Sequence, residues 1–351
     1  YLHSEREIET DKFDRPRPWK VTQFRFAHQK MHTSTDNLSA GLIHGENQES
    51  TPARAPAPAP SPLERGTLIL GYVALVFVNV ASSMGIFGPS NVVVSNTYPT
   101  AVTPAGYAFS IWGIIFVLEG SGVAFLSWPA DGGSVRAITA RCVRSSWLVM
   151  WTCQNLWQIV FVQTPLTPPT PYASLNTIFV PCCFLLLSSW AAGLTACRRL
   201  AVAGFQSHAA GVLVALGSAI NTGWLSAASC IGLALVGQGC VGGPDAFNDT
   251  GAPLALASAA TGGALLALQQ WGAGYLGLGY AGAVAWALCA VAVNTANPAS
   301  TPQVRSSALA GACVIAVGSA ATVLARGLRL AGVNLPFGGS ATRSGPSVPC
   351  Y

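Results

Sequence analysis

Beyond residue 65 the sequence has very few ionisable side chains. Residues 66–351 contain four acidic residues, nine arginines, one histidine and no lysine. Charged residues make up 9% of the whole chain, whereas a soluble domain carries roughly 25%. With 51% hydrophobic residues and a mean hydropathy of +0.46, the chain is expected to be a polytopic membrane protein.

The sequence also lacks the motifs of common enzyme and metal sites. It contains no phosphate-binding loop, no HExxH and no GxSxG, and its ten cysteines form no CxxC pair. So few acids and histidines offer little equipment for acid–base chemistry, and we predict that the protein is not an enzyme. The net charge of +5 equals the nine arginines minus the four acids of residues 66–351. It therefore lies in loops and does not indicate a nucleic-acid partner.

Before the apolar part, the chain has two polar segments. Residues 1–50 form an arm of mixed charge with scattered aromatics, which is expected to be a solvated tail or a segment that holds the subunits of a membrane complex. Residues 51–66 are rich in Pro and Ala and should form a semi-rigid linker.

About eight apolar segments are long enough to cross a bilayer, which takes about 20 residues each. The sequence therefore predicts an all-α membrane bundle of about eight transmembrane helices and a C-terminal tail over residues 328–351. The predicted spans are 67–87, 107–128, 143–163, 172–197, 208–236, 253–271, 275–294 and 306–325.

Loop charge predicts the orientation of this bundle. With eight spans, both termini lie on one side, together with nearly all arginines of the membrane part, and Arg305 lies on the other side. This is the positive-inside pattern, so both termini are expected in the cytoplasm, matrix or stroma. The arginines on the first side are Arg65, Arg136, Arg141, Arg144, Arg198, Arg199, Arg326, Arg329 and Arg343.

Small residues recur every four positions in the fifth and sixth spans. They allow close approach of helix backbones in lipid, so the sequence predicts that these two helices pack tightly against each other. The stripes are Gly211, Ala215, Ala219 and Gly223, and Ala255, Ala259, Gly263 and Ala267.

Polar side chains inside the predicted spans are expected to have a structural or functional role, because burying a polar group in lipid costs free energy. Glu119 could ligate a tetrapyrrole metal, pair with an arginine, carry a proton, or be solvated near the positive side. His208 begins the fifth span and is either interfacial or a second axial ligand. Asn79 and Asn221 are further candidate partners.

The third span carries the richest polar face. Trp147, Trp151, Asn155 and Gln158 share one side of the helix, and Gln154 and Trp157 flank them. Such a face suits a planar ligand that stacks on rings and is hydrogen-bonded at its edge. An interhelical hydrogen-bond seam with packed tryptophans is the alternative.

Aromatic residues also gather where the second span begins, in the stretch Asn96–Leu118. Tyr107, Phe109 and Trp112 follow Pro104, a residue well suited to a helix start. They are either an interfacial aromatic belt or the lining of a site between helices.

Three motifs resemble the tryptophan-rich sensory protein family, also called TspO or translocator protein. Pro104, Phe109 and Trp112 resemble the start of that family's second helix, and TPAGYAFSIWG is similar to its larger bacterial relatives. WTCQNLWQIVFV (Trp151–Val162) and INTGWLSAAS (Ile220–Ser229), which contains Trp224, resemble its third and fifth helices. The sequence departs from the family in lacking the usual Pro-Tyr before Trp224.

The resemblance implies a five-helix unit over residues 67–236, followed by three additional helices over 237–327. It also implies a pocket for porphyrin, haem or a sterol-like ligand, in a sensor, carrier or scavenger, and a carotenoid or lipid is a further candidate ligand. The alternatives are a pigment-binding subunit of a larger membrane complex, such as a photosystem with chlorophyll in a chloroplast thylakoid, and a solute transporter. Every reading shares the lipid bilayer as partner.

Overall fold

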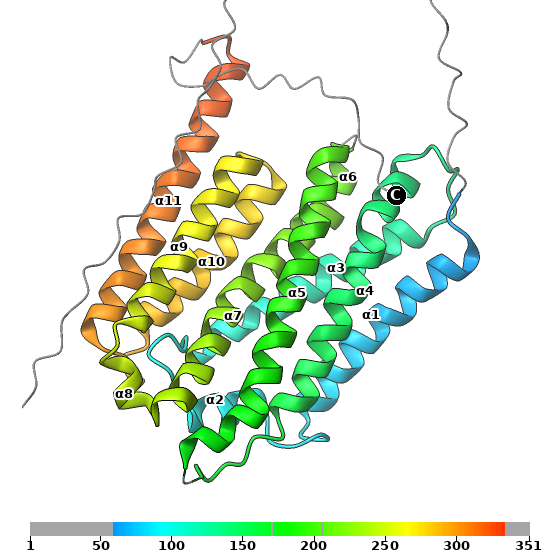
Figure 1. Cartoon of the computed structure of the whole chain (residues 1–351). Coiled ribbons are helices and arrows are strands. Elements are labelled where there is room, and N and C mark those ends of the chain that lie inside the picture. The colour runs from blue at the N-terminus through cyan, green and yellow to red at the C-terminus, as the bar shows by residue number, and fades with distance from the viewer. Residues whose placement is uncertain (1–58, 170, 205–206, 334–351) are drawn as a thin grey trace, which may run out of the picture. The chain divides into compact units, whose positions relative to one another are not determined.

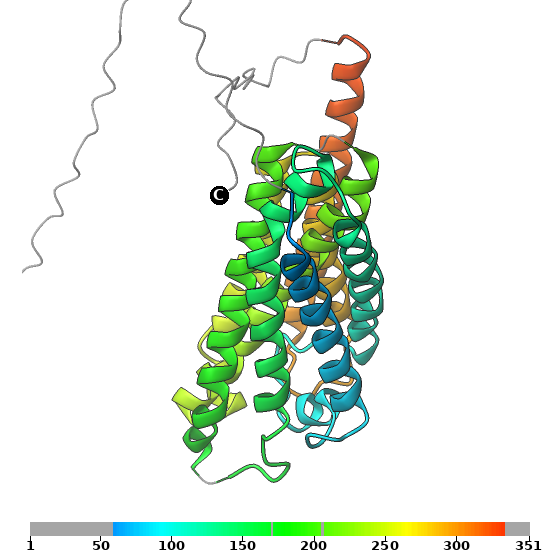
Figure 2. The same ribbon diagram turned by 90° about the vertical axis from the view of Figure 1, so that its right-hand side faces the viewer.

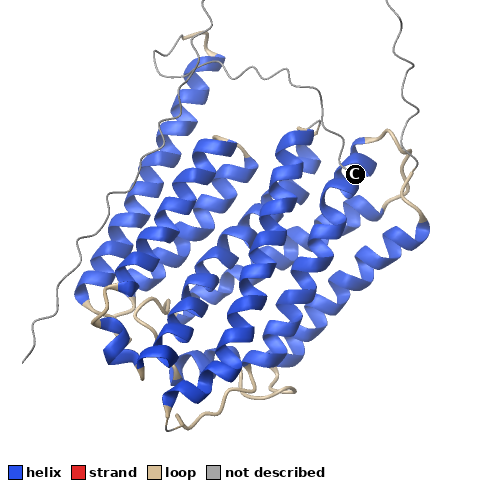
Figure 3. Ribbon diagram, viewed as in Figure 1, coloured by secondary structure: helices blue, strands red, loops and turns tan. Residues whose placement is uncertain are grey.

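The computed structural model describes residues 59–169, 171–204 and 207–333. These residues belong to one compact unit that begins at Ala55. The predicted arm and most of the linker lie outside the described residues, as does the tail beyond residue 333. Within the described ranges all regular structure is helical, with no strand (Figure 3).

Eight long helices form the bundle, and short helices lie at their ends and in the loops (Figure 1). The long helices are α1 (Pro62–Ser83), α3 (Ile111–Ser127), α4 (Val135–Phe161), α5 (Asn176–Ala203), α7 (Gly217–Val241), α9 (Ala252–Trp271), α10 (Tyr275–Val293) and α11 (Pro302–Leu330). The short ones are α2 (Asn91–Thr97), η1 (Gly106–Ser110), η2 (Tyr172–Leu175), α6 (His208–Ala210), η3 (Gly211–Leu216) and α8 (Pro244–Asn248).

The predicted spans correspond to these helices one by one. Seven helical segments of the described chain are long and apolar enough to cross a membrane. The eighth long helix, α4, contains the predicted third span, but it begins at Val135 rather than at 143 and includes three arginines. Its arginines and its Trp, Asn and Gln side chains make α4 less apolar than the other seven. It lies beside α1 and α5 in the bundle (Figure 1).

The long helices alternate in direction, so α1 begins at the same end of the bundle at which α11 finishes (Figure 1). α11 extends past its neighbours at that end (Figure 2). The first residues of α1 and α4 and the last residues of α5 and α11 carry eight of the nine arginines that were predicted to share one side, and the ninth, Arg343, lies outside the described residues. The compartment that this end faces stays a prediction.

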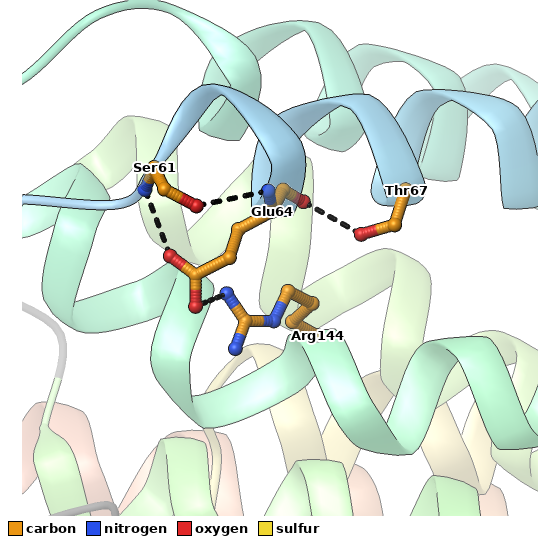
Figure 4. Close-up of polar contacts among 4 residues, drawn as sticks. All are labelled: Ser61, Glu64, Thr67 and Arg144. Carbon is orange, nitrogen blue, oxygen red and sulfur yellow. Dashed lines mark hydrogen bonds and ion pairs between the residues drawn. The ribbon is translucent and has the colours of Figure 1, made fainter.

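The first turn of α1 is held by two side chains (Figure 4). Ser61 Oγ accepts a hydrogen bond from the Glu64 backbone N–H at 3.2 Å, and the Ser61 backbone N–H donates to the Glu64 carboxylate at 2.8 Å. This reciprocal arrangement is a capping box. Glu64 also forms an ion pair with Arg144 of α4, which ties the start of α1 to the neighbouring helix.

The small residues Ala219 and Gly223 of α7 pack against α10, and α7 contacts α9 less extensively, so the prediction that the two small-residue stripes pack on each other is wrong. A Cβ at Gly223 would lie 2.4 Å from the Tyr280 carbonyl oxygen, and Ala219 lies against Gly279. On α9 the buried positions include Ala257 and Ala260. The predicted α9 stripe fails because a four-residue repeat drifts around a helix of about 3.6 residues per turn, which leaves Ala255 and Ala259 exposed.

Gly223→Ala should destabilise the bundle by about 1–3 kcal/mol, the usual cost of forcing an extra methyl group into a packed core. The new Cβ meets backbone of α10, which cannot rotate away as a side chain can. Gly262→Ala in α9 is the matched control, because no atom lies within 4 Å of its added Cβ. Thermal unfolding in detergent should show a lower Tm for the first variant only. Equal melting of both variants would contradict close contact between α7 and α10.

The loop that precedes α3 is held by the end of α10 and by the loop between α10 and α11. Asn297 Nδ2 donates to the Thr100 carbonyl oxygen at 2.8 Å, and the Ala105 N–H donates to the Ala290 carbonyl oxygen at 3.0 Å. At the start of this loop, the Tyr98 hydroxyl donates to the Pro165 carbonyl oxygen at 2.5 Å. Burial raises the pKa of Tyr98, which keeps this hydroxyl protonated. The last helices therefore fix the approach to the aromatic residues of η1 and α3.

Candidate functional site

Glu119 lies in the middle of α3 and is wholly buried. Its Oε2 accepts a hydrogen bond from Trp151 Nε1 at 2.8 Å, and its Oε1 accepts one from Asn221 Nδ2 at 2.8 Å. A carboxylate accepts hydrogen bonds readily, so donors from α4 and α7 converge on both of its oxygens. The Glu119 side chain thus connects α3 to both α4 and α7 by buried hydrogen bonds.

The hydrogen bonds continue from Asn221 to a second amide, which belongs to α4. Asn221 Oδ1 accepts from Gln154 Nε2 at 2.8 Å. We call the four residues Trp151, Glu119, Asn221 and Gln154 the Glu119 relay. All four side chains are buried. Hydrogen bonds between buried polar side chains favour one arrangement of the helices, because a shifted helix would leave buried polar groups without partners.

The buried face of α4 differs by one residue from the predicted face. Trp147, Trp151 and Gln158 are buried as predicted, but Gln154 takes the place expected for Asn155. Asn155 is half-buried, and its Oδ1 has no hydrogen-bond partner. Trp147 Nε1 donates to Ser218 Oγ at 2.9 Å, so much of this face is an interhelical hydrogen-bond seam.

A cavity lies beside the relay, between α2, α3, α4, α5 and α7. The space inside it that a water-sized sphere can enter is about 50 Å³, below the usual range for small-molecule sites, so a flat-ring ligand would have to move the lining side chains apart. We call it the aromatic cavity because six of its lining residues are aromatic: Phe109, Trp112, Trp157, Phe161, Phe179 and Trp224.

The rings of this cavity are arranged as separate flat walls. Trp224 meets Phe109 edge to face, with ring centroids 5.8 Å apart, and meets Trp112 in the same way at 6.4 Å. On the α4 side, Trp157 stacks on Phe161 with centroids 5.1 Å apart. The sequence-predicted residues Phe109, Trp112 and Trp224 are therefore brought together in one site.

Two amide side chains supply polar atoms to the same walls. Gln154 and Asn91 line the cavity, and the buried atoms Gln154 Oε1 and Asn91 Oδ1 have no hydrogen-bond partner among the described residues. Buried polar atoms are nearly always paired. Two unpaired acceptors in one cavity wall are therefore the feature expected of a site that a ligand completes.

A second cleft, open toward α1, shares a wall with the aromatic cavity. Asn91, Phe109 and Trp112 line both, and Gln158 lines only the cleft. Gln158 Oε1 accepts from Asn91 Nδ2 at 2.8 Å, and its Nε2 donates to Ser82 Oγ. Gln158 therefore positions a wall residue of the cavity from behind.

The structure places the other predicted site residues elsewhere. Tyr107 is 48% exposed and packs edge to face on Trp286 of α10. His208 is exposed at the opposite end of the bundle, where its Nδ1 and the Tyr275 hydroxyl are 2.5 Å apart. Trp147, Trp151 and Glu119 are not among the residues that line the aromatic cavity.

Glu119 and His208 do not form a shared metal site. Both carboxylate oxygens of Glu119 already accept hydrogen bonds, and His208 lines a different cleft with Arg326. In the described part of the chain no group of three or more His, Cys, Asp or Glu side chains could hold a metal ion. Axial ligation of a tetrapyrrole metal by Glu119 or by His208 stays a prediction.

Several lining residues of the aromatic cavity could not be predicted from the sequence. Asn91 lies in α2, a short helix in a loop that no apolar run marks. Trp157 and Gln154 were recognised only as flanking residues of the α4 face. Phe161 and Phe179 follow no motif, and only the packing of α4 against α5 brings them to the same cavity.

The helices and the cavity define a polytopic membrane protein with an aromatic-lined pocket between its spans. The profile of the TSPO-like protein family matches residues 66–321, and the chain belongs to this family. No curated protein and no solved structure matches the chain.

The match begins in α1 and ends in α11, so it includes the three helices that were predicted as additions to a five-helix unit. The division into residues 67–236 and 237–327 stays a prediction. Proteins of this family are generally non-enzymatic membrane proteins, in line with the scarcity of acid–base groups.

Proposed function

We propose that this protein binds a flat, ring-containing ligand of the tetrapyrrole class in the aromatic cavity. One observation carries the proposal: the indole and phenyl walls hold two buried amide oxygens, of Gln154 and Asn91, that have no hydrogen-bond partner in the described part of the chain. Flat rings stack on aromatic side chains, and the unpaired oxygens would receive hydrogen bonds from the ligand's edge.

Membership of the TSPO-like family supports this ligand class, because the family generally binds porphyrins. Porphyrin, haem and chlorophyll share the flat ring, while carotenoids and lipids do not. The separate ring walls of Trp112 and Trp157 favour the flat class. Chlorophyll, a photosystem complex and a thylakoid location find no particular support among the described residues and stay predictions.

Binding here rests on stacking and hydrogen bonding. The two residues considered as axial ligands, Glu119 and His208, do not line the cavity, so the ring's edge, not a metal centre, is what the wall amides would recognise. A binder of this kind serves as a sensor, carrier or scavenger of its ligand.

Trp112→Ala should weaken the binding of protoporphyrin IX about tenfold, since one stacked aromatic contact and its buried area contribute on the order of 1–2 kcal/mol. Trp112 is half-buried at the cavity wall, so its removal should leave the bundle folded. Quenching of tryptophan fluorescence during titration in mild detergent gives the affinity.

Trp128→Ala is the matched control, because Trp128 ends the same helix and is 66% exposed. It should bind like the parent, and Trp112→Phe should recover most of the affinity. Equal affinities for the parent and Trp112→Ala would place the ring outside this cavity. If the parent bound a carotenoid or a lipid but no porphyrin, the proposed tetrapyrrole class would be wrong, and the ligand would belong to the class that binds.

A further inference from the structure

We infer that Glu119 is a positioning residue that sets which hydrogen-bonding group the aromatic cavity offers to its ligand. Through Asn221 it holds Gln154 so that the carbonyl oxygen, and not the amide nitrogen, is left for the ligand. This inference rests on the proposed function and narrows it to rings that carry an N–H or O–H donor.

The direction of the relay follows from the ionised form of Glu119, whose two carboxylate oxygens can only accept hydrogen bonds. The indole nitrogen of Trp151 can only donate a hydrogen bond, and it donates to Glu119 Oε2. The carboxylate then has only its second oxygen, Oε1, for Asn221. Asn221 Nδ2 donates a hydrogen bond to Glu119 Oε1 at 2.8 Å.

The donor and acceptor roles of the next two residues, Asn221 and Gln154, follow in the same way. Because the Asn221 nitrogen faces Glu119, its oxygen faces Gln154, and Gln154 must present its own nitrogen to that oxygen at 2.8 Å. What remains of Gln154 is Oε1, which is buried and without a partner. An amide that could turn freely would offer either polarity, whereas this one offers an acceptor.

The other wall amide has no such constraint. Asn91 donates to Gln158, and Gln158 donates to Ser82 Oγ. A serine hydroxyl both donates and accepts, so this second chain of hydrogen bonds can run in either direction. Gln154 is therefore the selective group of the cavity, and Asn91 is an adaptable one.

Glu119→Gln should reverse the relay at almost unchanged side-chain volume. The new amide must turn its oxygen to the Trp151 N–H, so its nitrogen faces Asn221. Asn221 and Gln154 then rotate in turn, and Gln154 presents an N–H donor to the cavity. A change in ligand polarity preference, rather than a general loss of binding, is the signature of this positioning role.

The test uses two probes that share one tricyclic shape, carbazole with an N–H donor and 9-fluorenone with a C=O acceptor. The parent should bind carbazole about tenfold more tightly than 9-fluorenone, since a buried acceptor left unpaired costs about 1–3 kcal/mol. Glu119→Gln should bind 9-fluorenone more tightly than carbazole. Fluorescence titration of both proteins in detergent measures the four affinities.

Gln154→Met is the second variant, since it removes both polarities without substituting Glu119. It should bind the two probes equally, whatever the folding of Glu119→Gln. Equal affinities for both probes in the parent, or the parent's order retained in Glu119→Gln, would overturn the inference. The proposed function fails separately, by an unchanged porphyrin affinity in Trp112→Ala.

Discussion

Asn221→Leu is expected to lower the free energy of unfolding by about 2–6 kcal/mol, because it leaves two buried polar groups without their hydrogen-bond partner. The substitution leaves Glu119 Oε1 and Gln154 Nε2 without their partner, and both residues are buried. Each orphaned polar group contributes about 1–3 kcal/mol to this loss. Denaturant titration in mixed micelles, followed by tryptophan fluorescence, measures the change.

Asn155→Leu is the matched control on α4. Asn155 is half-buried, and its Oδ1 has no partner in the folded protein, so leucine removes no hydrogen bond at that oxygen. It should therefore be neutral or slightly stabilising. A similar loss of stability in both variants would mean that the relay contributes nothing beyond ordinary packing.

The sequence could not show that Gln154, and not Asn155, is the buried amide of α4 that joins the relay. Neighbouring residues of a helix point about 100° apart, so a small error in the assumed rotation of α4 exchanges Asn155 for Gln154. The apolar pattern does not fix that rotation, because tryptophans occur on more than one side of the helix. The contacts with α3 and α7 fix it, and these depend on residues far apart in the chain.

The positions of the helices could be predicted far better than their partners. The length and hydropathy of each run place the spans, because a bilayer needs about 20 apolar residues for a crossing. The start of α4 at Val135 escaped this reasoning, since arginines are compatible with a helix but not with an apolar window. The pairing of α7 with α10 escaped it because small residues are abundant on several helices.

Some residues of the aromatic cavity could be predicted from the sequence, and others could not. Phe109, Trp112 and Trp224 stood in motifs, and the structure brings them into one cavity. Asn91 stood in no motif, and its role comes from the fold of the loop between α1 and α3. Glu119 was considered as a ligand, but its two hydrogen bonds place it behind the wall, where it acts on the cavity only through other side chains.

A chain that ends at Gly242 is expected to lose saturable porphyrin binding altogether, although it keeps every lining residue of the aromatic cavity. The missing helices hold the segment that carries Phe109. Trp286 Nε1 of α10 donates to the Ala108 carbonyl oxygen at 3.0 Å, and Asn294 Nδ2 donates to the Thr103 carbonyl oxygen at 3.2 Å. Without these bonds, only ring and apolar contacts position the start of α3 against α7.

The truncation also uncovers the face of α7 that packs on α10. Gly223 and Ala219 fit closely against that helix, and small residues stabilise a membrane bundle only where another backbone approaches them closely. A chain that ends at Val333 keeps every described residue and serves as the control, with parent-like affinity in the same fluorescence titration. If the chain ending at Gly242 also bound protoporphyrin IX like the parent, residues 67–236 would be an autonomous unit. The contacts through α10 make the opposite result the expected one, because the wall residues of η1 and α3 depend on them for their place.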